Sequence, residues 1–68
     1  MNEEALNSTV RKFLKKVGIT SQREIEKAVR EAVSSGKLHG HERLRAHVTL
    51  TVEAIGLRHE VEGEISFQ

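Results

Sequence analysis

The fold is decided by the stretch 44-LRAHVTLTVEAIGLRHEVEGEISF-67, in which apolar and polar side chains alternate. Side chains of a β-strand repeat every two residues, so consecutive residues lie on opposite faces of the strand. The alternation breaks at Ile55-Gly56 and then resumes. We therefore expect an antiparallel β-hairpin with strands at about 44–54 and 57–67, one face apolar and the other polar.

The register of this hairpin follows from matching apolar residues across the two strands. Closure between Ala54 and Leu57 places Val52 opposite His59 and sets apolar residues against each other along the inner face. A slip of one residue would turn a whole strand over, so the faces are strongly specified. A two-residue turn would need a positive φ at β-branched Ile55, whereas a four-residue loop from Ala54 to Leu57 keeps the same register without that strain.

Two helices are expected before the hairpin, at about 3–17 and 22–35, because apolar residues recur there at helical spacing. Asn2 is a suitable N-cap for the first helix. Gly18 suits the left-handed position after a last turn, and Ser21-Gln22-Arg23-Glu24 matches a capping box for the second. We expect both helices to pack on the apolar face of the hairpin, in a single α+β domain that spans residues 1–68.

Composition limits the classes of protein that fit. The 68 residues include no cysteine, which removes thiol catalysis and argues against a disulfide-stabilised secreted scaffold. The net charge of +1 is far from the basic balance of a dedicated nucleic-acid binder. No apolar run reaches the roughly 20 residues of a membrane span, and the acidic start Met1-Asn2-Glu3-Glu4 is unlike a signal peptide. We expect a cytoplasmic protein.

Four histidines are the candidate metal ligands. Two lie in the loop before the hairpin, at His39 and His41, and two lie on opposite hairpin faces, at His47 and His59. A zinc site needs three or four convergent ligands, and no recognised spacing supplies them. We read them as loop and surface residues and expect no metal or cofactor, although His59 is unusual because it falls on the apolar face.

A basic cluster offers a nucleic-acid hypothesis. Arg11, Lys12, Lys15 and Lys16 could contact phosphate, and Gly18 could be the turn of a helix-turn-helix with the hairpin as a wing. The second helix, however, also carries several glutamates. The interpretation that we favour is a solvated helix face, with nucleic-acid binding as the alternative.

The sequence gives less support to an enzymatic function than to nucleic-acid binding. The serines show no nucleophile motif, and Ser21 is explained as a helix cap. Glu60, Glu62 and Glu64 share one exposed strand face rather than a pocket that would shift their pKa values. We therefore expect a protein that is not an enzyme.

Self-association would relieve the bare edges of a two-stranded sheet. Pairing of two copies through the second strand would set glutamates against glutamates. Pairing through the first strand, centred on Thr49, brings together compatible residues. This predicts a homodimer edge formed by Arg45, His47, Thr49, Thr51 and Glu53.

Five short segments of the chain carry a family resemblance. They are the helical segments 11-RKFLKKVG-18 and 20-TSQREIEKA-28, and the hairpin segments 49-TLTVE-53, Gly56-Leu57 and 62-EGEI-65. Together they resemble a family of short bacterial proteins known only as a domain of unknown function. The resemblance covers almost the whole chain. It implies a bacterial cytoplasmic protein and supplies no activity, ligand or functional residue.

The sequence thus predicts a small, non-catalytic protein-interaction domain that acts as a homodimer. The alternative is a nucleic-acid-binding protein with a helix-turn-helix or winged-helix-like arrangement.

Overall fold

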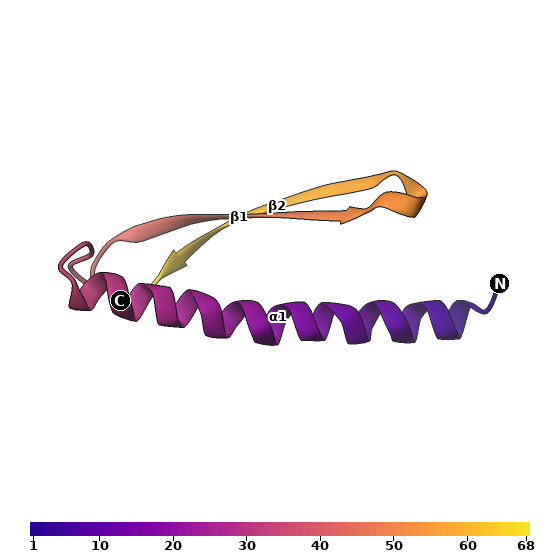
Figure 1. The fold of residues 1–68 in the computed structure, drawn as a ribbon, viewed down its shortest axis with the longest axis horizontal. Coiled ribbons are helices and arrows are strands. Elements are labelled where there is room, and N and C mark those ends of the chain that lie inside the picture. The colour runs from indigo at the N-terminus through magenta and orange to yellow at the C-terminus, as the bar shows by residue number, and fades with distance from the viewer. The chain divides into compact units, whose positions relative to one another are not determined.

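One long helix is followed by an antiparallel hairpin in the computed structural model, which describes residues 1–68 (Figure 1). The elements are helix α1 (Glu3–Ser34), strand β1 (Arg43–Val52), the short 3-10 helix η1 (Glu53–Ile55) and strand β2 (Leu57–Ser66). They form two units, Met1–Lys37 and Leu38–Gln68, and each is described by itself. The α+β class and the hairpin are therefore confirmed.

The start and end of α1 follow the capping signals at its two ends. The side chain of Asn2 accepts a hydrogen bond of 3.1 Å from the backbone N–H of Ala5, which confirms the predicted N-cap. At the other end, Gly36 has a φ of 82° and its N–H donates to the carbonyl of Val33 at 3.1 Å. Glycine adopts a positive φ without steric strain, so the chain can leave the helix at Gly36.

The prediction of two helices is wrong, because α1 runs without a break through residues 18–21 as a helix of 32 residues. Gly18 does not take the positive φ of a helix C-terminus. Thr20 donates its hydroxyl to the carbonyl of Lys16 at 2.8 Å, and Ser21 caps nothing. Gly in a helix interior costs only about 1 kcal/mol relative to Ala, which is too little to interrupt a helix that continues on both sides.

The two strands confirm the predicted faces and correct the predicted register. Val52 pairs with Leu57, and Leu50 rather than Val52 lies opposite His59. The pairing is thus displaced by two residues from the one that we predicted. Because side chains repeat every two residues, a displacement of two leaves every residue on its predicted face.

The turn explains this displacement. Four residues, Glu53–Gly56, connect the strands, and the N–H of Gly56 donates to the carbonyl of Glu53 at 3.0 Å. Gly56 has a φ of 63°, and no residue other than glycine has a positive φ. Ile55 avoids the strained conformation by lying in the 3-10 turn, where 73% of its surface is exposed. The loop therefore has the predicted length but begins one residue earlier.

Many large apolar side chains of both units are exposed. Phe13 on α1 exposes 54% of its surface, and the cross-strand pair Val48 and Val61 exposes 49% and 50%. No residue of the chain is fully buried. No helix of the chain combines the length and the apolar character that a membrane span requires.

Candidate functional site

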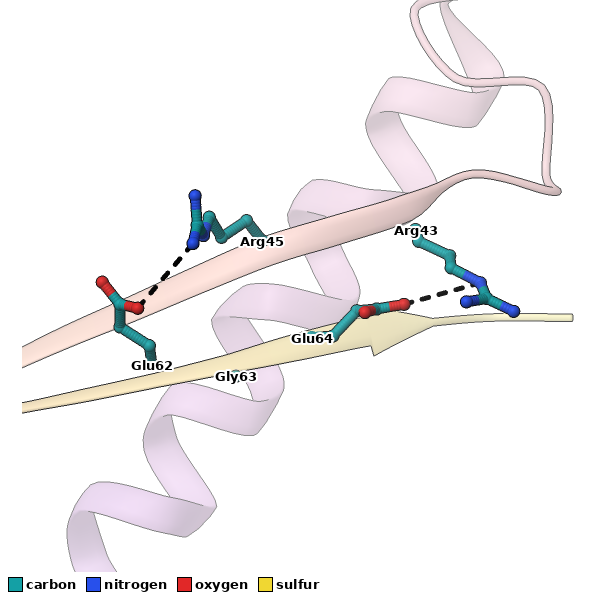
Figure 2. A pocket seen from close by; sticks show the side chains of 5 residues that line it. All are labelled: Arg43, Arg45, Glu62, Gly63 and Glu64. Carbon is teal, nitrogen blue, oxygen red and sulfur yellow. Dashed lines mark ion pairs between the residues drawn. The ribbon is translucent and has the colours of Figure 1, made fainter.

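The polar face of the hairpin carries a ladder of charges. Three basic side chains of β1 each reach diagonally to a carboxylate of β2, and the pairs are Arg43–Glu64 at 3.5 Å, Arg45–Glu62 at 3.9 Å and His47–Glu60 at 3.7 Å. Figure 2 shows the first two of these pairs. We call these six residues the charge ladder. It balances the charge of a face whose β2 half is acidic.

The shortest ion pair of the hairpin joins the charge ladder to Arg58, near the turn. Nη2 of Arg58 donates to Oε1 of Glu60 at 2.6 Å, while Oε2 of the same carboxylate lies 3.7 Å from Nε2 of His47. The carboxylate of Glu60 thus lies between a basic side chain of each strand. All these side chains are well exposed, so each pair contributes at most about 1 kcal/mol.

A shallow hollow of about 480 Å³ opens at the other end of the ladder. It is lined by Arg43, Arg45, Glu62, Gly63 and Glu64. Its guanidinium groups and its carboxylates already form the two pairs of Figure 2. The hollow therefore presents charges of both signs that neutralise each other, which suits weak polar contact better than the tight holding of one ion.

The loop before β1 is organised around a single carboxylate that sequence reasoning missed. Glu42 accepts hydrogen bonds from the backbone N–H groups of His39 at 2.8 and 3.0 Å, Gly40 at 3.0 Å and His41 at 3.2 Å. The N–H of His39 contributes most, and together these donors lower the pKa of Glu42 from 4.5 to about 2. The only signal in the sequence is a glycine, Gly40, two residues before an acid, and its φ of 98° permits the tight loop.

The four histidines considered as metal ligands do not converge on one point in the structure. The rings of His39 and His41 stack with centroids 6.3 Å apart, whereas His47 faces Glu60 and His59 lies on the apolar face opposite Leu50. No group of three or more His, Cys, Asp or Glu side chains is arranged to hold a metal ion.

Four of the five residues predicted to form a dimer edge lie on strand β1. Arg45, His47, Thr49 and Thr51 alternate along the polar face of β1, and β1 has one free edge because the sheet has only two strands. Glu53 is an exception, since β1 ends at Val52 and Glu53 begins η1. A strand pair between Arg45 and Glu53 of two copies is therefore not available.

The basic cluster lies within the helix and not at its end. Arg11, Lys12, Lys15 and Lys16 are all exposed and lie in the middle of α1. No turn follows them, so the helix-turn-helix arrangement that we considered is not formed. What remains of that hypothesis is a set of cations along one helix.

The chain is thus a small α+β protein with one long helix and a two-stranded hairpin. It belongs to a family of unknown function, DUF6494, whose model matches residues 1–68. This confirms the resemblance to a family of unknown function, whereas the bacterial origin stays a prediction. Neither the curated proteins nor the solved structures contain a match to the chain.

Proposed function

We propose that this protein is a non-catalytic association module that works as a two-fold homodimer. The observation that carries the proposal is the exposure of the large apolar side chains of both units, of which Phe13 and Val61 keep about half of their surface exposed (54% and 50%). Exposed apolar faces of this kind mark interaction surfaces. A chain of 68 residues also gains more from association than a larger domain would.

The free edge of β1 is the pairing surface that the charges favour. Two-fold antiparallel pairing about Thr49 sets Thr49 against its own copy and places His47 against Thr51 on the polar face. On the apolar face it places Val48 against Leu50 and extends the apolar surface across four strands. Pairing through β2 about Glu62 would instead bring three carboxylates from each copy together. The pairing that we propose spans residues 46–52, because the strand ends at Val52.

A lysine at Thr49 separates dimerisation from hairpin folding. In the hairpin, Thr49 lies opposite Glu60, so Thr49→Lys gains an opposite charge there. In the dimer the same lysine meets its own copy at the two-fold axis. We expect Thr49→Lys to lower the fraction of dimer measured by sedimentation equilibrium, while circular dichroism remains that of the wild type. Ile55→Lys is the matched control, because it adds the same charge in the turn.

Two outcomes would count against this proposal. A wild-type mass equal to that of the monomer at high micromolar concentration would reject the homodimer. A dimer that Thr49→Lys and Thr49→Pro leave intact would reject the β1 edge, because a proline removes a backbone donor and does not fit in the middle of a sheet.

The cations of α1 support a second candidate, nucleic-acid binding. Every ion pair within 4.0 Å lies in the hairpin, so Arg11, Lys12, Lys15 and Lys16 have no carboxylate partner. A mobility-shift assay over a salt series tests this alternative, since binding by phosphate contacts weakens steeply as salt rises. The absence of a shift even at low salt would rule out nucleic-acid binding.

The packing of α1 on the hairpin and the cytoplasmic location stay predictions.

A further inference from the structure

The N-terminal half of α1 carries basic residues without acidic neighbours. Between Glu4 and Glu24 the chain has four basic residues and no acidic one. All four side chains are exposed, and no carboxylate of α1 lies within 4.0 Å of any of them. We call them the cationic face of α1, which consists of Arg11, Lys12, Lys15 and Lys16.

The spacing of these cations works against the helix that carries them. Arg11 lies four residues before Lys15. Lys12 stands in the same relation to Lys16. Like charges at this spacing repel each other across one helical turn, whereas residues 23–34 of the same helix mix cations with carboxylates. A local choice that opposes the fold is typical of a functional surface.

The cationic face lies opposite the apolar residues of the same helical turns. At about 100° per residue, the four cations occupy an arc of about 140° around the helix axis. The apolar residues occupy an arc of about 100° whose centre is about 180° away, and they are Leu6, Val10, Phe13, Leu14 and Val17. A surface that covers the apolar arc therefore leaves the cations open to a partner.

The carboxylates of the hairpin unit already have partners within that unit. Glu60, Glu62 and Glu64 belong to the charge ladder, in which each lies 3.5–3.9 Å from a basic side chain of β1. Glu42 accepts the N–H groups of its own loop. Glu53 is left, and one carboxylate balances one cation. The cationic face is therefore complementary to an anionic partner outside the chain.

The make-up of the cationic face favours nucleic acid over protein or lipid. A protein interface is centred on apolar and aromatic side chains, and a helix on a membrane inserts its apolar side into the lipid. Phosphate contacts need only cations. The one large apolar side chain on the cationic arc is Ile19, which is 43% exposed. An apolar side chain between cations suits the methyl group of thymine in the major groove of DNA.

Among nucleic acids, duplex DNA fits this helix best. Proteins that bind single strands stack bases on aromatic side chains, and Phe13, the only aromatic residue of α1, lies on the apolar arc. Duplex RNA has a major groove too narrow for side chains to read. The major groove of B-DNA is about 12 Å wide and admits a helix of about 10–12 Å in diameter. Arg11 and Lys16, at the two edges of the cationic arc, would then face the two phosphate backbones.

We propose that α1 binds duplex DNA in the major groove through phosphate contacts of the cationic face. The inference rests on the nucleic-acid candidate above and names its ligand, and it is compatible with the homodimer. Because the contacts are made to phosphates, the binding is largely independent of base sequence.

Fluorescence anisotropy with the full-length protein tests the proposal. The labelled probes are a short DNA duplex, one of its single strands and the RNA duplex of the same sequence, each titrated at about 50 to 200 mM salt. We expect the DNA duplex to bind most tightly. The logarithm of its binding constant should fall with the logarithm of salt with a slope of about −3 to −4 per bound chain, since each phosphate contact contributes about −0.9.

A double variant connects the salt dependence to the cationic face. Lys12→Gln/Lys16→Gln should bring the slope closer to zero by about 2 and weaken binding at about 50 mM salt at least tenfold. The matched control, Lys27→Gln/Arg30→Gln, removes the same charge from the other half of α1 and should change the slope by less than about 1. Glutamine forms helices nearly as well as lysine and arginine, and circular dichroism checks the fold.

Arg11→Gln/Lys15→Gln repeats the test if the first variant loses helix. Equal changes of slope in the cationic-face and control variants would overturn the assignment to this face. Binding to the single strand or the RNA duplex as tight as to duplex DNA would overturn the major-groove ligand and leave the broader nucleic-acid candidate standing. Binding to phosphatidylserine vesicles without binding to duplex DNA would overturn the proposal in favour of a membrane surface. No change of anisotropy with any probe would reject both nucleic-acid statements, while the sedimentation mass still decides the homodimer.

Discussion

Nε of Arg43 lies 3.5 Å from the carboxylate of Glu64, although the backbone partner of Arg43 is Ser66. The same diagonal step joins Arg45 to Glu62. The charge ladder is therefore a property of the register, since the pairing that we predicted from the sequence would have kept these groups apart.

Charge reversal within the ladder should weaken the hairpin. Glu62→Lys places a cation beside Arg45 and directly opposite His47, and we expect it to lower the free energy of unfolding by about 0.5–1 kcal/mol. Adding Arg45→Glu restores an opposite pair and should recover most of the loss. Urea unfolding of the single and double variants measures both effects. An equal loss of unfolding free energy in the single and double variants would contradict the charge ladder. In 1 M salt, the difference in unfolding free energy between the two variants should become smaller.

Replacement of Gly18 by alanine should stabilise the protein. Gly18 lies inside α1, has no positive φ, and an added Cβ meets no atom within 4 Å. Alanine should therefore raise the free energy of unfolding by about 0.5–1 kcal/mol. Thermal unfolding followed by the helix signal is the measurement. The control is Gly36→Ala, which should destabilise because Gly36 has a φ of 82°. If Gly18→Ala also destabilised the chain, Gly18 would be the end of a helix, as the two-helix prediction held.

These two cases show what the sequence could and could not determine. Alternation predicted both strands and both faces correctly, because successive side chains of a strand always point to opposite faces. It could not choose between registers two residues apart, since both keep the same faces and the turn decides between them. The helix break was over-predicted because Gly18 and the Ser21 capping box are local signals, each worth about 1 kcal/mol, and the hydrogen bonds of a continuous helix outweigh them.

The Glu42 loop could not be predicted for a different reason. Its stability depends on three backbone N–H groups that converge on one carboxylate, and backbone donors leave no pattern in a sequence.

The stability of the hairpin unit should fall with acid through Glu42. Folding lowers the pKa of Glu42 from 4.5 to about 2, so the folded state favours the ionised carboxylate. This contribution is complete above about pH 4.5 and is lost as the pH falls toward 2. Glu42→Gln should lower the melting temperature near neutral pH, and the difference from wild type should shrink across that window. Glu53→Gln serves as the control for loss of one charge, and a difference that is independent of pH would contradict the role of Glu42.

Gly63 provides a test of the apolar face of the hairpin. It pairs with Ala46, has no positive φ, and a Cβ added to it meets no atom within 4 Å. Glycine inside a strand costs about 0.5–1 kcal/mol relative to alanine, so Gly63→Ala should raise the free energy of unfolding by that amount. Gly56→Ala is the opposite control, because its φ of 63° should make alanine unfavourable by about 1 kcal/mol or more. Denaturant unfolding of both variants at several protein concentrations measures the effects. A loss of stability in Gly63→Ala would contradict the open face and would indicate that another surface already fills the space above Gly63.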